Sequence, residues 1–145
     1  MKYLRIIVIV TRILLGGLFL YAGIQKFIPK PPRTHTESVE AIPDNVLKIK
    51  EFIGGMKQTG YFWPMLGAAE IICGILLLSQ YFALLGSVML LPIMINIFMF
   101  HLFLKPDDTG DLIMTGLYLS GNILLIGYHF PTLKIAFLTN KTITQ

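Results

Sequence analysis

Six polar residues fall within, or at the edge of, segments that are otherwise strongly apolar, and they are the first candidates for chemistry. They are Arg12, Lys26, Glu70, Asn96, His101 and Asn122. Polar and charged side chains are costly in a bilayer, so those inside a spanning segment usually face the bundle interior and often mark a functional site. We therefore expect a ligand-binding site among these six residues, although the sequence identifies no catalytic residue.

Arg12 and Glu70 are the charged residues deepest in these segments. At about 1.5 Å per helical residue, Arg12 lies about 12 Å, Glu70 about 15 Å and Asn122 about 12 Å from the side that holds the termini. This depth predicts one polar layer with an Arg12–Glu70 ion pair, into which Asn122 is hydrogen-bonded. A buried pair is ambiguous. It either only sets the register of the helices or belongs to a ligand-binding or proton-handling site.

A second polar group is expected nearer the opposite side. His101 lies about one turn before Pro106, Asn96 lies between the two groups, and Lys26 ends the first apolar segment. Histidine titrates near neutral pH, so His101 could donate to a ligand carbonyl or relay a proton, or it could simply lie at the interface. Lys26 is explained most simply as an anchor whose ammonium group reaches the interface.

Several other kinds of site are disfavoured. Cys73 is the single cysteine, so the chain has neither an internal disulfide nor a CxxC redox pair. His101 and His129 would lie about 25 Å apart on antiparallel helices, too far to clamp one haem. His35 lies in a loop, so no metal site is expected. The sequence has no P-loop, no GxSxG motif and no dinucleotide-binding fingerprint.

The composition indicates that lipid rather than water surrounds the protein. The chain has 145 residues, of which 54% are hydrophobic and only 14% charged, whereas soluble domains have roughly 25% charged residues. The net charge of +4 is carried mostly by termini and loops, where membrane topology and lipid headgroups account for it. The sequence has no basic stripe with interleaved aromatic residues, so a nucleic-acid partner is not expected.

Four segments are long and apolar enough to cross a bilayer, which takes roughly 20 residues. They run over residues 4–28, 61–79, 82–104 and 112–130. We therefore predict a single integral membrane domain over residues 1–145, all-α, built as a bundle of four transmembrane helices. The first segment exceeds the signal-peptide core of about 7–15 residues, so we expect it to be retained. Four spans put both termini on one side, and the basic start of the first helix favours the cytoplasm.

The first loop, over residues 29–60, is predicted to contain an amphipathic helix. Prolines open the loop, and from Asp44 to Met56 apolar residues recur at helical spacing. Asp44 is the expected N-cap, and Gly54 and Gly55 are expected to weaken the end of the helix. The pattern favours a helix that lies on the membrane surface. A lid folded over the mouth of the bundle is the alternative.

The first two apolar segments together resemble a known family. The first contains RILLGGLFLYAGIQKF from Arg12, and the second contains PMLGAAEIICGILL from Pro64. An arginine, glycines and a lysine on one helix, then a glutamate followed by a glycine on the next, are similar to the DoxX family of small four-helix membrane proteins. The resemblance spans the four helices but not the long first loop. By position it implies functional roles for Arg12 and Glu70, with Lys26 as a further match.

The family takes its name from a subunit associated with a terminal quinol oxidase and with thiosulfate–quinone oxidoreduction. The resemblance therefore implies quinone-linked redox work in a bacterial inner membrane. We expect an accessory subunit that binds a quinone near Arg12, Glu70 and His101 and assists a partner oxidoreductase, and we leave open whether the chain is itself an enzyme. The alternatives are a non-catalytic scaffold or assembly protein, and a small proton-coupled transporter that would need to form a homo-oligomer through small-residue faces.

Overall fold

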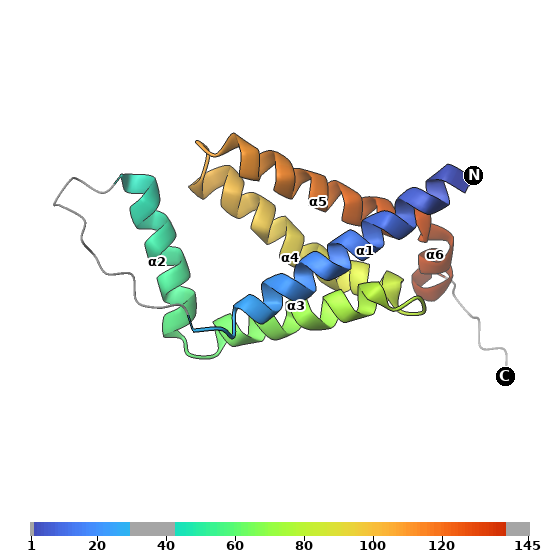
Figure 1. The fold of residues 1–145 in the computed structure, drawn as a ribbon, viewed down its shortest axis with the longest axis horizontal. Coiled ribbons are helices and arrows are strands. Elements are labelled where there is room, and N and C mark those ends of the chain that lie inside the picture. Colours follow the sequence, from blue (N-terminus) through green and yellow to red (C-terminus); the bar gives the residue numbers. More distant parts are fainter. Residues whose placement is uncertain (1, 30–42, 139–145) are drawn as a thin grey trace.

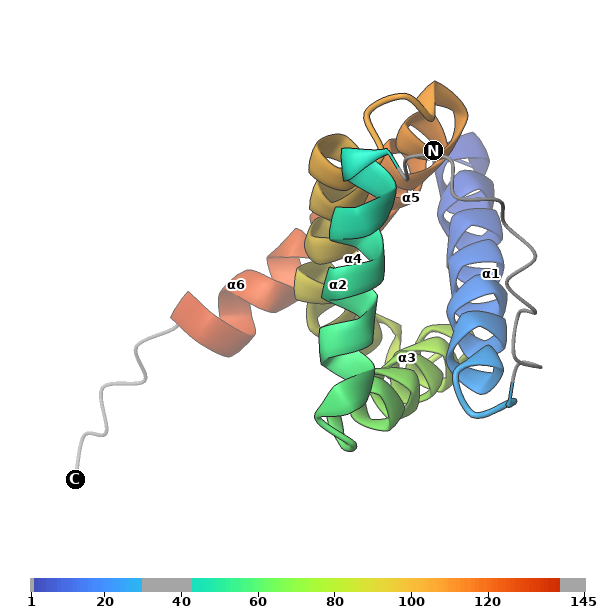
Figure 2. The same ribbon diagram turned by 90° about the vertical axis from the view of Figure 1, so that its left-hand side faces the viewer.

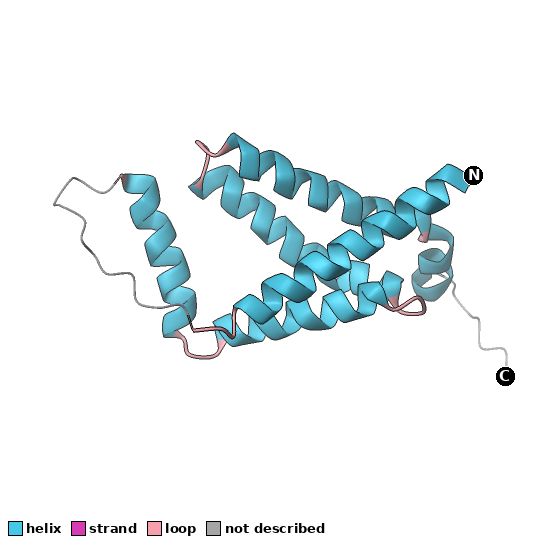
Figure 3. Ribbon diagram, viewed as in Figure 1, coloured by secondary structure: helices cyan, strands magenta, loops and turns pink. Residues whose placement is uncertain are grey.

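The computed structural model describes residues 2–29 and 43–138, and the secondary structure there is entirely helical (Figures 1 and 3). The helices are α1 (Lys2–Gln25), α2 (Asp44–Gln58), α3 (Phe62–Leu78), α4 (Ala83–Leu104), α5 (Thr109–Tyr128) and α6 (Phe130–Leu138). The all-α class is thereby confirmed. Pro31, Pro32 and His35, at the start of the expected first loop, lie outside the described residues.

The long helices support an integral membrane protein. α1, α4 and α5 are each long and apolar enough to cross a membrane. α3 has 17 residues, and together with α2, from which it is bent by 88°, it forms a further candidate. The described residues thus contain three to four candidate spans. Each of the four segments expected from the sequence overlaps one helix, α1, α3, α4 or α5, and the ends agree to within three residues.

The four long helices form a closed ring of neighbours. α1 packs on α3, α3 on α4, α4 on α5, and α5 returns to α1. Figure 2 looks down this arrangement with α2 in front. The N-terminus, the α3–α4 turn and α6 lie at one end of the bundle, called here the terminal end, and α2 and the α4–α5 turn lie at the other, the loop end (Figure 1).

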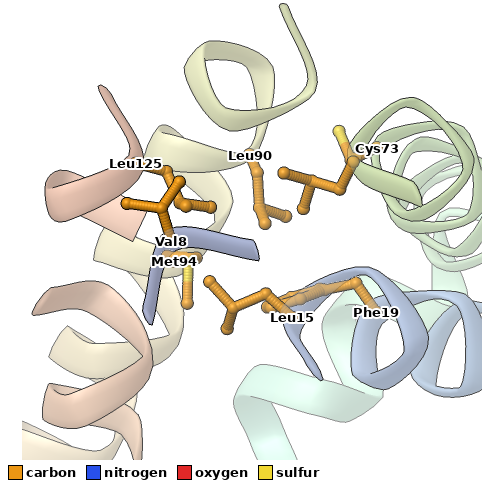
Figure 4. Packing of buried hydrophobic residues seen from close by; sticks show 8 residues of the cluster. Val8, Leu15, Phe19, Cys73, Leu90, Met94 and Leu125 are labelled. Atoms are coloured by element: carbon orange, nitrogen blue, oxygen red, sulfur yellow. The ribbon is translucent and has the colours of Figure 1, made fainter. Parts of the chain in front are cut away.

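A small apolar core fills the centre of the ring (Figure 4). It consists of Val8, Leu15, Phe19, Cys73, Leu77, Leu90, Met94 and Leu125. Cys73 is a buried member of this cluster, as expected for a small apolar residue. Most large apolar side chains of the long helices instead point outward, as in a bundle whose outer surface meets lipid.

Glycines bring α1 and α3 into backbone contact. A methyl group on Gly23 would lie 2.6 Å from the Gly67 carbonyl oxygen, and one on Gly74 would lie 2.8 Å from the Gly16 carbonyl oxygen. Both distances are shorter than any ordinary carbon–oxygen contact, so only glycine fits at these positions. On each helix the two glycines are seven residues apart, and their pairing sets the antiparallel register of α1 on α3.

The helix in the first loop is present, but it differs in detail from the one expected. Its N-cap is Pro43, and Asp44 lies in the first turn without a side-chain capping bond. Gly54 and Gly55 do not end it, because α2 continues to Gln58. The turn into α3 uses Gly60, whose φ of 74° lies in the left-handed region that glycine adopts without strain.

α2 packs against α4 and α3 at the loop end of the bundle. The Phe52 ring lies 5.7 Å from the Phe100 ring, and the Asn45 side-chain amide donates to Asp107 at 3.1 Å. α2 is nearly perpendicular to α3 and packs against the end of the bundle, and its placement on the membrane surface or as a lid stays a prediction.

α6, a short helix after α5, was not predicted from the sequence. α5 stops at Tyr128, and Pro131, in the first turn of α6, has no N–H with which to continue α5. Proline is well tolerated at that position of a new helix. His129 lies at the break, where its Nδ1 lies 3.0 Å from the Leu125 carbonyl oxygen.

Candidate functional site

A buried ion pair joins α1 to α3 near the loop end. Lys26 directly follows α1, and Glu70 lies in the middle of α3. Lys26 Nζ lies 2.5 Å from Glu70 Oε2, and the two side chains are 15% and 2% exposed. Away from water the Coulomb attraction between them is strong, and it offsets part of the cost of removing both charges from solvent.

The ion pair expected between Arg12 and Glu70 is therefore wrong, because Glu70 is paired with Lys26. The register of α1 on α3 explains the difference. With Gly16 against Gly74, Arg12 lies level with Leu78, about 12 Å along the helix axis from Glu70. The long lysine side chain can reach back to Glu70 from the end of α1, whereas the arginine is displaced toward the terminal end.

An indole ring forms part of the surroundings of the pair. Lys26 Nζ lies 5.4 Å from the centroid of the Trp63 ring, and Lys57 of α2 lies over the same ring at 4.9 Å. Both distances suit cation–π attraction. The site thus combines an ammonium group with several N–H donors, a carboxylate and a flat aromatic surface, beneath the end of α2.

Arg12 lies in a different place, at the terminal end. It lines a hollow of 520 Å³ together with Arg5, Val8, Ile9, Gln80, Tyr128 and His129. Arg12 Nε is buried and has no hydrogen-bond partner among the described residues. The hollow lies where α1 passes the α3–α4 turn and the break between α5 and α6.

The two candidate asparagines have different surroundings, and neither joins the Lys26–Glu70 pair. Asn122 is fully buried, and its Nδ2 donates to the Ser87 carbonyl oxygen at 3.0 Å. Pro92 on α4 has no N–H and so frees the carbonyl of Val88, the residue next to Ser87, but the Asn122 amide bonds Ser87. Asn96 is exposed on α4, so it faces away from the bundle interior. The single polar layer expected from depth is therefore not formed.

His101 lies at the loop end beside the α4–α5 turn. Its Nδ1 lies 2.8 Å from the Ile97 carbonyl oxygen, which can only accept, so Nδ1 carries the proton. Its Nε2 lies 3.8 Å from Asp111 Oδ2. Lys105 Nζ donates to Asp108 at 2.9 Å and to Asp111 at 2.7 Å. His101 is thus part of a charged cluster at the turn.

Two of these loop-end groups have shifted pKa values. The hydrogen bond from Lys105 lowers the pKa of Asp108 below its usual value. The bonds to Asp108 and Asp111 raise the pKa of Lys105. Asp108 is also the N-cap of α5, since its side chain accepts from the Asp111 N–H.

The structure thus divides the six candidates into separate groups, and it adds residues that the sequence did not single out. Lys26 and Glu70 meet near the loop end, and Arg12 lies in the hollow at the terminal end. The added residues are Trp63 beside the ion pair and Arg5, Gln80, Tyr128 and His129 in the hollow. Among the described residues, no three His, Cys, Asp or Glu side chains gather in a group that could hold a metal ion.

Comparison with known proteins gives one clear relationship. No curated protein and no solved structure matches the chain. The model of the DoxX family matches residues 7–102, which is more than half of the chain. The matched region runs from α1 through most of α4 and includes Arg12, Lys26, Glu70 and His101. This chain is a membrane protein that belongs to the DoxX family.

Proposed function

We propose that this protein is a quinone-linked accessory subunit with four membrane spans, and that it binds a quinone headgroup at the loop end. α3 would be the fourth span, because 17 residues extend about 26 Å, close to the roughly 30 Å of a bilayer's hydrocarbon core. The 88° bend then lays α2 along the membrane surface, over the Lys26–Glu70 pair. We place the protein in a bacterial inner membrane with both termini in the cytoplasm.

The observation that carries the proposal is the buried Lys26–Glu70 pair beside Trp63. A quinone headgroup is a flat ring with two carbonyl oxygens that accept hydrogen bonds. Lys26 has three N–H donors and gives one to Glu70, so it can donate another to a carbonyl. Trp63 offers a flat surface on which a ring can stack. The residues present therefore fit the group.

The chemistry that a bound quinone would supply is the transfer of two electrons and two protons. Glu70 would hold the Lys26 ammonium in place, and the two groups could take up and release a proton as one coupled unit. α2 would limit the access of water to them. One cysteine cannot cycle between dithiol and disulfide, so the proposal assigns the delivery of electrons to a partner oxidoreductase.

The test is to measure quinone that co-purifies with the protein. Protein in mild detergent is extracted, and the quinone per mole of protein is quantified by mass spectrometry for wild type, Glu70→Gln and the control Glu51→Gln, an exposed residue of α2. We expect quinone in wild type and control, and about tenfold less in Glu70→Gln. Circular dichroism and gel filtration confirm that the variant is folded. Equal quinone in all three proteins, or none in wild type, would refute the proposal.

A non-catalytic scaffold is the second candidate, and one observation favours it. The Lys26–Glu70 pair lies at the same α1–α3 contact as the glycines, so it can be explained entirely as a lock between two helices. The double variant Lys26→Met/Glu70→Leu separates the two functions, because a buried pair can often be replaced by apolar residues without loss of stability. A scaffold would keep its partner in pull-down experiments with this variant, whereas the quinone-binding subunit would lose quinone.

A further inference from the structure

The hollow at the terminal end has features that the quinone proposal does not use. It is lined from three parts of the chain: α1, the α3–α4 turn, and the break between α5 and α6. Two guanidinium groups, Arg5 and Arg12, line it together with the side chains of Gln80, Tyr128 and His129. None of the lining residues is acidic.

The charge of Arg12 has no counterion in the described part of the chain. Its Nε is buried without a hydrogen-bond partner among the residues that the structure describes. Glu70 is the one acidic residue in α1, α3 and α4, and it is paired with Lys26. The other acidic residue of the long helices, Asp111, lies at the loop end in the first turn of α5. A buried N–H without a partner is costly, and the charge of the half-buried Arg12 is not balanced here, so an anion from outside the chain would stabilise this end of the bundle.

We propose that the hollow binds a phosphate group, and that the phosphate belongs to the headgroup of an anionic phospholipid. Arginine presents a planar fork of N–H donors that matches two phosphate oxygens at once. Arg5 and Arg12 lie two helical turns apart on α1 and converge on the hollow, so they can contact the phosphate from two directions. The hydroxyl of Tyr128 and the amide of Gln80 can donate further hydrogen bonds.

The location favours a lipid as the source of this phosphate. The hollow lies at an end of helices that cross the membrane, and Val8 and Ile9 form an apolar wall along α1. The neighbouring side chains of Ile6 and Ile13 are exposed. A headgroup can therefore occupy the hollow while its acyl chains follow the apolar outer surface of α1. Soluble phosphate would use the same arginines but would gain nothing from this apolar surface.

Native mass spectrometry tests the proposal on the full-length protein in detergent. Wild type, Arg12→Gln and Arg5→Gln are titrated with phosphatidylglycerol, with zwitterionic phosphatidylcholine, and with inorganic phosphate. Lys134→Gln is the matched control, because Lys134 is an exposed cation of α6 at the same end but outside the hollow. Arg5 is exposed, so Arg5→Gln keeps the test available if Arg12→Gln does not fold.

We expect wild type and Lys134→Gln to retain phosphatidylglycerol in preference to phosphatidylcholine, and each arginine variant to retain about tenfold less. Equal retention by the arginine variants and by Lys134→Gln would overturn the proposal. Displacement of the lipid by millimolar inorganic phosphate would overturn the lipid assignment in favour of free phosphate. Loss of quinone rather than lipid from Arg12→Gln would also overturn it. Because the Glu70 variant concerns the other end of the bundle, the two proposals can fail independently.

Discussion

The backbone contact between α1 and α3 predicts that Gly74→Ala destabilises the protein although alanine is the better helix former. The new methyl group would lie 2.8 Å from the Gly16 carbonyl oxygen and 2.8 Å from the Leu20 nitrogen. Ordinary contacts begin at 3.4 Å, so the helices must separate by roughly half an ångström, and such overpacking costs about 1–3 kcal/mol. The intrinsic gain from glycine to alanine is about 1 kcal/mol. We expect a net loss of about 1 kcal/mol.

Gly17→Ala is the control for this experiment, because a methyl group on Gly17 would have nothing within 4 Å. This variant should keep the gain in helix propensity, so it should equal or exceed wild type in stability. Equilibrium unfolding in mixed micelles, followed by the fluorescence of Trp63, the single tryptophan, measures both changes. If Gly74→Ala were as stable as Gly17→Ala, the close approach of α1 and α3 and the register derived from it would be refuted.

Three other variants test the polar groups. Lys26→Met should cost about 3–5 kcal/mol in unfolding experiments, because it leaves Glu70 buried and unpaired, and the added change Glu70→Leu should restore most of that loss. Asn122→Asp should cost about 3 kcal/mol or more by the same measurement, since an ionised carboxylate cannot donate to a carbonyl and is fully buried. Because the pKa of Asp108 is lowered below 3.8, its stabilising effect is present above that pH and is lost as the pH falls through the lowered value. Carboxyl NMR titration should show this, and Lys105→Met should return the Asp108 pKa toward its usual value.

The spans were predictable from the sequence because long apolar runs are constrained by the thickness of a bilayer. Each expected segment overlaps one observed long helix to within three residues at each end. α6 was not predictable in the same way. A proline such as Pro131 ends one helix as readily as it begins another, and Phe130–Leu138 is too short to give a clear periodic signal. The two glycines in α2 were expected to weaken its end, but tertiary contacts such as Phe52 on Phe100 help to stabilise that helix.

The prediction of a single polar layer is wrong because the depth of each residue in the membrane follows from its position along its own helix only if the helices are aligned. Counting along each helix assumes that all four helices end at the same level. α1 instead extends past the α3–α4 turn, since Arg5 and Arg12 line the same hollow as Gln80. The paired spacing of Gly16 and Gly23 with Gly67 and Gly74 could have indicated the register. Matching these two spacings in antiparallel order places Glu70 nearer to Lys26 than to Arg12.

Arg12 and Lys26 of α1 differ in how their charges are compensated, and this difference is the basis of the two ligands that we propose for the two ends of the bundle. Arg12 and Lys26 are separated by about 21 Å along the helix, which is most of the roughly 30 Å of a bilayer's apolar core. Lys26 has an internal counterion in Glu70, so the pair itself carries no net charge, and the cation that remains nearby is Lys57, over the Trp63 ring. Arg12 has no carboxylate beside it in the hollow, so its surroundings remain positive and suit an anion. Because α1, α3 and α4 together contain one acidic residue, only one of the two cations can be neutralised from within these helices, and the register set by the glycines determines that it is Lys26.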